Sequence, residues 1–347
     1  MDSLFIINNE VTKRSLLPVF ETLKKNIKCY ILSDDYSMNN LYSYSESFIE
    51  ARDALKKNWF YVFHSDPVEK AIFKGLRVSL PHGAMFGNNS WTLRMFQGSD
   101  LYFGISPPEL RYIRSHLGNN FPVKKFFAAG NPAHDKIYDE LLKRKKKIIE
   151  PVEANREKTI LISSHWTSSG NFRKYGSGLI DALRFTFPRC KILVDCHPKI
   201  FENPKNEFRI NRFFSTPNFN ADWLLSYFKS IENENIKIIK EKEDRWSAMG
   251  KADVFIGDCS SMVAEAARFK IPLIIQKDIK YFDSRIQKIV QADTYGFDSI
   301  EDLVAIVDAV LFNNDRDDTG QYIRKLFSYN IGGVVTTVSD YLLRKTG

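Results

Sequence analysis

The 347-residue chain has few cysteines and no long apolar run, and each shortage excludes a class of protein. The four cysteines form no CxxC pair and no metal-spaced cluster, which favours reduced thiols in the cytoplasm over a disulfide framework. The longest apolar stretch, residues 303–312, is interrupted by Asp308 and falls short of the ~20 residues that a membrane-spanning helix needs. The start, Met1-Asp2-Ser3, lacks the basic residues of a secretory signal, so we expect a cytoplasmic protein.

Motifs that identify several large enzyme classes are missing as well. No GxGxxG follows an expected strand, and no GxxxxGK[ST] is present, which excludes the dinucleotide fingerprint and the P-loop. There is neither a G-x-S-x-G nucleophile elbow nor an HExxH zinc motif. We therefore expect no metal site and no obligatory cofactor.

The positive charge is concentrated in one place. The formal net charge is +8, and five of the positive charges form the run Lys143, Arg144, Lys145, Lys146 and Lys147. The rest of the chain is almost balanced, which argues against a nucleic-acid partner. Two interpretations of the run stay open: a solvated helix end, or a patch that contacts an anionic acceptor or the anionic inner face of the cell membrane.

Short β-branched or aromatic runs alternate with longer amphipathic ones, a pattern typical of a parallel sheet with helices on both faces. Strands are expected at residues 4–7, 29–32, 59–63, 77–80, 101–105, 125–129, 159–163, 191–195, 236–239, 254–256 and 273–275. Helices are expected at residues 11–25, 47–57, 107–116, 178–187, 222–231, 260–269 and 300–311.

The polar segment 143–158, which contains Pro151, interrupts this alternation and is predicted to link two domains. The predicted fold class is α/β, with two doubly wound, Rossmann-like domains at residues 1–150 and 151–347 that face a cleft.

Ligands of such sheets bind beyond the carboxyl ends of the strands, so the residues directly after strands are the first candidates. His82-Gly83 follows the expected strand at 77–80, and the near-neutral pKa of histidine suits a general base. A histidine packed under a loop is the alternative. His197-Pro198-Lys199 follows a strand of the second domain and offers two donors to an anionic group.

Two further loops follow strands. The loop at residues 163–170 is rich in hydroxyls and holds Ser164 and His165, which suit a phosphate or a base, although polar loops are also common without a ligand. The string Gly130-Asn131-Pro132-Ala133-His134-Asp135 opens a helix after the last strand of the first domain. Its glycine and proline shape a turn, and Asn131 or Asp135 suits a helix cap, which favours a structural role.

The string Gly257-Asp258-Cys259-Ser260-Ser261 follows a buried strand and opens a helix. The free amides and the dipole at such a helix start favour an anion, and the serine hydroxyls add donors. Ordinary capping by Asp258 or Ser260 is the alternative, although it accounts for one residue and not for the whole string. Glu265 lies one turn beyond Ser261 on the same helix face, where a nucleotide site would let it accept from ribose hydroxyls.

Taken in order, five strings between about residues 80 and 280 resemble the CDP-glycerol glycerophosphotransferase family, whose members build polyol-phosphate polymers such as teichoic acids and some capsules on a GT-B scaffold. The matching residues are His82-Gly83, Gly130/Pro132/Asp135, His197-Pro198, Asp258/Ser260/Ser261/Glu265 and Ile271-Pro272-Leu273-Ile274. The sequence departs from the family at Ala84-Met85, where the family usually has Thr-Pro, and at Ala133 and Asp195, where the family often has an arginine.

The resemblance implies a transferase that moves glycerol phosphate from CDP-glycerol, or a related activated donor, to a lipid-linked or oligosaccharide acceptor. It implies His82 as the general base, and it implies that the donor is held by the second domain. The residues implied for the donor diphosphate and ribose are His197, Ser260, Ser261 and Glu265, with Ser164, His165 and Asp258 beside them.

Other functions stay open on the same scaffold. A GT-B glycosyltransferase or a UDP-sugar 2-epimerase would use the same two domains and the same serine-rich helix start. We find no set of acidic residues placed for the proton abstraction that an epimerase needs. A nucleotide-binding protein without catalytic activity is a third reading, against which the two strand-end histidines, His82 and His197, argue modestly.

Overall fold

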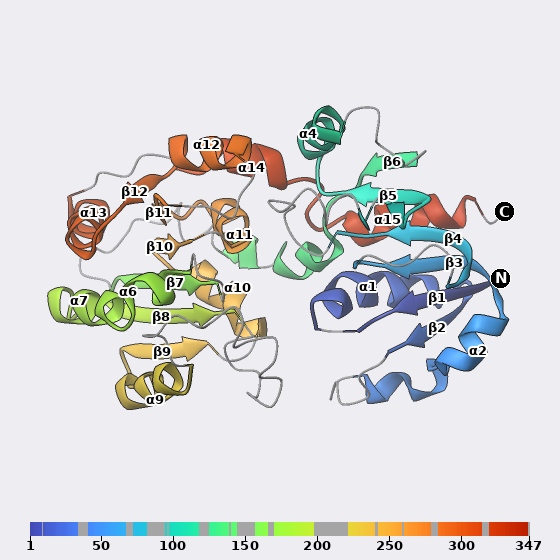
Figure 1. The fold of residues 1–347 in the computed structure, drawn as a ribbon, viewed down its shortest axis with the longest axis horizontal. Coiled ribbons are helices and arrows are strands. Elements are labelled where there is room, and N and C mark those ends of the chain that lie inside the picture. The colour runs from blue at the N-terminus through green and yellow to red at the C-terminus, as the bar shows by residue number, and fades with distance from the viewer. Residues whose placement is uncertain are drawn as a thin grey trace. The chain divides into compact units, whose positions relative to one another are not determined.

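The chain forms two compact units, shown in a computed structural model (Figure 1). One unit consists of Met1–Tyr138 together with Lys325–Gly347, and the other of Asp139–Arg324. The structure describes residues 1–8, 10–33, 41–66, 72–81, 94–95, 97–117, 125–138, 140–143, 157–165, 170–197, 221–239, 242–258, 260–278, 284–313 and 319–345.

The first unit is built on a six-stranded parallel sheet with the order β2-β1-β3-β4-β5-β6. Its strands are β1 Asp2–Ile6, β2 Lys28–Leu32, β3 Asn58–His64, β4 Lys74–Ser79, β5 Leu101–Gly104 and β6 Lys125–Ala128. All six lie within a few residues of the strands expected from sequence. They could be predicted because strands covered on both faces read as nearly continuous apolar runs.

Helices cover both faces of this sheet. The elements are α1 Glu10–Leu23, η1 Tyr42–Ser47, α2 Ala51–Lys56, α4 Pro107–Leu117, η3 Pro132–Ile137 and α15 Val334–Leu343. Successive strand residues point to opposite faces. Phe5 and Phe63 stack at 4.2 Å in the core that α1 and α15 share, whereas Leu4 and Val62 pack on the side of α2. Of the helix expected at 47–57, α2 forms only residues 51–56; η1 ends at Ser47, and Phe48 and Glu50 between the two elements are extended.

The end of the chain belongs to the first unit, whereas the expected boundary at residue 150 places it in the second domain. The Tyr61 hydroxyl donates to the carbonyl oxygen of Leu342 at 3.0 Å. Asp135 accepts from the backbone N–H groups of Gly332, Val334 and Val335, and so caps α15. These contacts join residues 197 to 281 positions apart, which a division drawn along the sequence does not reveal.

The string that begins at Gly130 therefore has a structural role, as the sequence favoured. Asn131 caps η3 by accepting from the N–H of Ala133 at 3.0 Å. Gly130 has a φ of 101°, and a Cβ at that position would lie 2.5 Å from Val334. The turn is thus shaped to receive the start of α15.

Replacing Asp135 by Ala should lower the free energy of unfolding of the first unit by about 1–2 kcal/mol, because three backbone donors at the start of α15 lose their acceptor. Urea unfolding measures the change. Asp340→Ala on the exposed side of the same helix is the matched control and should cost less than about 0.5 kcal/mol. Equal unfolding midpoints for the two variants would contradict the capping role.

The second unit is built on another six-stranded parallel sheet, with the order β12-β11-β10-β7-β8-β9. Its strands are β7 Thr159–Ser164, β8 Lys191–Cys196, β9 Ile236–Ile239, β10 Val254–Gly257, β11 Leu273–Gln276 and β12 Tyr295–Phe297. Five of them match the expected strands, and β12 is additional. The α/β class with two Rossmann-like sheets is confirmed.

The helices of this unit are α6 Asn171–Tyr175, α7 Gly178–Thr186, α9 Ala221–Ile231, α10 Lys242–Lys251, α11 Met262–Arg268, α12 Ser284–Ala292 and α13 Ile300–Phe312. A further helix, α14 Gln321–Phe327, leads the chain back to the first unit. The core that contains Ile162, Val194 and Ile256 of the sheet also contains side chains of α6, α7, α9 and α13. α10 contacts β7 and β9, and α11 contacts β10 and β11. No helix in the described part of the chain is long and apolar enough to span a membrane.

Candidate functional site

The carboxyl ends of three neighbouring strands bring the predicted donor residues of the second unit together. β10, β7 and β8 are adjacent and parallel, so the residues that follow them share one edge of the sheet. His165 follows β7 and His197 follows β8, and their rings meet edge to face with centroids 5.2 Å apart. The N–H of His197 donates to the carbonyl oxygen of Ser164 at 3.0 Å, which continues the pairing of the two strands.

Asp258, directly after β10, holds this edge together. Its side chain is fully buried, and Oδ2 accepts from the N–H of His165 at 2.7 Å and from the N–H of Asn171 at 3.0 Å. One carboxylate therefore fixes the residue after β7 and the first residue of α6. Asp258 also accepts a hydrogen bond from the backbone of Ser260, just before α11, so the capping alternative stays open beside these contacts.

Burial raises the pKa of Asp258 from 3.8 to about 6, and hydrogen bonds from the backbone of His165 and Asn171 oppose that rise. Below pH 6 a protonated Asp258 accepts these bonds less strongly, because a carboxylate is a better acceptor than a carboxylic acid.

The serine pair lies beside Asp258. α11 begins at Met262, two residues later than the sequence predicts, and the N-cap Ser261 makes no side-chain capping bond. Ser260 is 7% exposed, and its hydroxyl has no hydrogen-bond partner in the described part of the chain. A buried hydroxyl without a partner costs free energy, so such a group is a natural point for a ligand contact.

Glu265 and Asp195 are both held by α10. The indole Nε1 of Trp246 donates to Oε2 of Glu265 at 3.0 Å. Arg245, the residue before it, forms a two-point ion pair with Asp195, with contacts of 2.7 and 2.8 Å. Burial alone would lower the pKa of Arg245, but the nearby Asp195 carboxylate raises it above its ordinary value.

This arrangement suits an anionic ligand that carries hydroxyl groups. Two imidazoles and a buried serine hydroxyl offer donors, while the carboxylate of Glu265 offers acceptors. The buried ion pair of Asp195 and Arg245 is neutral as a whole, so it adds little net charge to the edge. No group of three or more His, Cys, Asp or Glu suited to a metal ion occurs in the residues that the structure describes.

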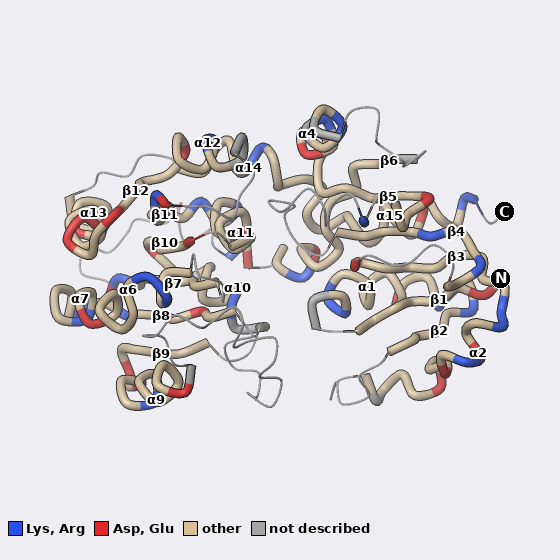
Figure 2. The backbone as a smooth tube through the Cα atoms, viewed as in Figure 1, with Lys and Arg blue, Asp and Glu red and all other residues tan. Residues whose placement is uncertain are grey.

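Two predicted sites, the His82 turn and the basic run that begins at Lys143, lie mostly outside the residues that the structure describes. His82, Arg144, Lys145, Lys146 and Lys147 lie outside the described residues. Lys143 is exposed and forms an ion pair with Glu140 at 2.6 Å. Along the described elements of both units, Lys and Arg are interspersed with Asp and Glu (Figure 2).

Sequence reasoning missed Arg245 and Trp246. Both lie on α10, whose polar sequence around them shows no regular apolar spacing. Asp195, an acidic residue at the end of an expected buried strand, was the available signal, because a buried carboxylate requires a cationic partner. Arg245 is that partner.

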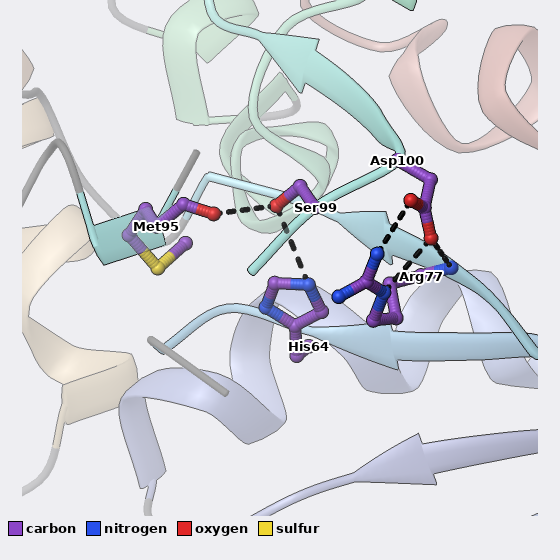
Figure 3. A network of polar contacts seen from close by, with 5 residues as sticks. All are labelled: His64, Arg77, Met95, Ser99 and Asp100. Carbon is purple, nitrogen blue, oxygen red and sulfur yellow. Dashed lines mark hydrogen bonds and ion pairs between the residues drawn. The ribbon is translucent and has the colours of Figure 1, made fainter. Parts of the chain in front are cut away.

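A second buried network, missed from sequence, lies in the first unit at the carboxyl end of β3 (Figure 3). His64 Nδ1 lies 2.9 Å from the carbonyl oxygen of Asp66, so this nitrogen carries the proton. Its Nε2 is 3.4 Å from the Ser99 hydroxyl, which donates to the carbonyl oxygen of Met95 at 2.6 Å. The carbonyl oxygen of His64 also accepts from the N–H of Leu80, just before the expected His82 turn.

The buried His64 should make the first unit sensitive to acid. Burial lowers its pKa from 6.5 to about 4, so between these values the unfolded chain binds a proton that the folded chain does not. Its contribution to stability is complete above pH 6.5 and is lost as the pH falls towards 4, by about 3 kcal/mol. His64→Asn should flatten the pH dependence of the unfolding free energy over this range.

Asp258 should act in the opposite sense in the second unit. Because its pKa is raised to about 6, its contribution is complete below pH 3.8 and is lost as the pH rises through 6. Hydrogen exchange followed separately on peptides of β3 and of β10 distinguishes the two effects. A His64→Asn variant that retains the full acid sensitivity of the β3 peptides would rule out this assignment.

Comparison with known proteins supports the fold and leaves the family open. No family model and no curated protein sequence matches the chain. Among solved structures, UDP-GlcNAc 2-epimerase from Neisseria meningitidis, bound to UDP-GlcNAc, has 15% identity and a TM-score of 0.61, over 99% of this chain and 100% of that one. A variant of the wall teichoic acid polymerase TagF has 11% identity and a TM-score of 0.60, over 99% of this chain and 88% of that one.

The lipopolysaccharide outer core galactosyltransferase WaaB, in its apo form, has 12% identity and a TM-score of 0.52, over the full length of both chains. These proteins carry out different reactions on one architecture. The chain has the two-domain α/β architecture of the GT-B fold.

Proposed function

We propose that this chain is a transferase that moves a polyol phosphate, with glycerol phosphate as the first candidate, from a CDP-activated donor to a hydroxyl group of a glycan or teichoic-acid-type acceptor. The observation that carries the proposal is the cluster of His165, His197, Asp258 and Ser260 at one edge of the second sheet. Each of these residues follows a strand, where an open parallel sheet binds its ligand.

The proposed chemistry assigns different tasks to the cluster. His197 and the serines hold the donor diphosphate and offset the charge that develops on the departing CMP. Glu265 accepts from the ribose. An acceptor hydroxyl oxygen attacks the β-phosphorus, the bond from that phosphorus to the oxygen of CMP breaks, and a phosphodiester forms. His82 takes the proton of the attacking hydroxyl.

The ordered strings from His82 to Ile274 resemble the CDP-glycerol glycerophosphotransferase family, which supports this reading over other uses of the fold. TagF, one of the structures with the same fold, is a wall teichoic acid polymerase, so the fold is compatible with such an activity. The alternative is a glycosyltransferase or a UDP-sugar 2-epimerase, since those activities also occur on this fold.

A thermal-shift panel tests the proposal. CDP-glycerol, CDP-ribitol and CMP should raise the melting temperature with increasing concentration, because a ligand that binds only the folded state stabilises it. UDP and UDP-GlcNAc, which carry uracil in place of cytosine, should raise the melting temperature much less. A response to the uridine compounds alone would overturn the proposal in favour of the alternative.

A further inference from the structure

Two consecutive residues of α10 reach different parts of the candidate site. Arg245 contacts Asp195 at the end of β8, and Trp246 contacts Glu265 on α11. Arg245 and Trp246 are each more than nine-tenths buried. Because each is anchored by a directional polar contact, α10 is held in register against both the sheet and α11.

The contact between Trp246 and Glu265 restricts a side chain that would otherwise rotate freely. The indole N–H is a single donor in a fixed direction, and the ring around it is buried. The bond goes to one oxygen of the carboxylate, Oε2. Glu265 itself is only partly buried, so its carboxylate is within reach of a ligand.

A carboxylate held in this way is preorganised to accept from a hydroxyl group. Fixing the acceptor before binding removes an entropic cost that binding would otherwise carry. Sites that hydrogen-bond a substrate hydroxyl also discriminate strongly against an analogue that lacks it.

We propose that Trp246 is a positioning residue that holds Glu265 for a ribose hydroxyl of the donor nucleotide, and that α10 thereby sets the preference for ribonucleotides over deoxyribonucleotides. The inference rests on the proposed function, since it requires the edge of the second sheet to bind a nucleotide. It adds a specificity role for a helix whose sequence carries no recognisable motif.

The test compares the Kd of CMP with those of 2′-deoxy-CMP and 3′-deoxy-CMP by calorimetry. The full-length chain should bind CMP at least ~10-fold more tightly than one of the two deoxynucleotides, since a hydrogen bond to a charged acceptor is lost. Glu265→Gln should bring that ratio close to one. Trp246→Phe, which keeps the ring and removes the N–H, should reduce the ratio roughly 3- to 10-fold and leave deoxynucleotide binding nearly unchanged.

Trp223→Phe is the matched control, because Trp223 is 48% exposed on α9 and stacks on Tyr227. It should keep the wild-type ratio. Tight CMP binding with the same ratio in Trp246→Phe as in wild type would overturn this inference alone. Wild-type protein that does not bind CMP at all would overturn the proposed function, and the inference with it.

Discussion

Replacing Arg245 by Met should lower the free energy of unfolding of the second unit by about 3–5 kcal/mol. The substitution removes the cation that contacts both carboxylate oxygens of Asp195 and leaves that carboxylate buried without its charge partner. The side chain of Asp195 is 1% exposed, so water does not compensate. Urea unfolding of the variant, followed by far-UV circular dichroism, measures the loss.

Two comparisons show whether burial of the ion pair causes this cost. The double variant Asp195→Leu/Arg245→Met should recover most of the stability, because an apolar pair of similar volume replaces the ion pair. Lys277→Met breaks the exposed ion pair of Lys277 and Asp298 and should cost less than about 1 kcal/mol. A double variant as unstable as Arg245→Met would show that the loss arises from something other than the unpaired charge.

Replacing His197 by Ala should reduce kcat/KM for CMP release from CDP-glycerol by about 10²- to 10³-fold, the range seen when one preorganised donor to a developing negative charge is removed. The proposed role places the imidazole of His197 against the donor diphosphate, beside His165 at the edge shared by β7 and β8. Initial rates measured with a glycerol-phosphate acceptor test the effect.

His197→Asn retains an N–H donor and should lose less activity than the alanine variant. Circular dichroism at equal concentration verifies that both variants are folded. Both retain the backbone N–H of residue 197, which bonds to Ser164. Unchanged kcat/KM in His197→Ala would remove this residue from the proposed mechanism.

The strand ends could be predicted because buried parallel strands leave a clear signal. The runs that became β8 and β10 are almost continuously apolar, and the polar residues after them mark where each strand stops. Once the strands are known, the rule that ligands bind beyond their carboxyl ends brings His165, His197 and Asp258 to one edge. The structure shows that arrangement in the second unit.

The partners of those residues could not be predicted in the same way. Asp258 bonds to backbone groups of His165 and Asn171, about 90 positions earlier, and backbone N–H groups carry no sequence signature. Arg245 and Trp246 belong to a helix formed mainly through its contacts with the sheet and α11, rather than through an apolar stripe. Such tertiary contacts override local pattern.

Two other misses have different causes. β12 has three residues, one of them Gly296, and so offers too short an alternation to read as a strand. The return of the chain to the first unit depends on Asp135 and Tyr61 meeting the last helix, which is a contact between distant segments. The sequence marked Asp135 as a capping residue and left open which helix it caps.

Hydrogen exchange with and without CMP, read by mass spectrometry, tests the central claim most directly, because it locates the ligand on the chain. CMP should slow exchange in the peptides covering residues 159–172, 191–198 and 254–266, and His197→Ala should weaken that protection at equal CMP concentration. CMP that binds and leaves all three peptides unprotected, or that fails to bind at all, would contradict the assignment of this edge as the nucleotide site.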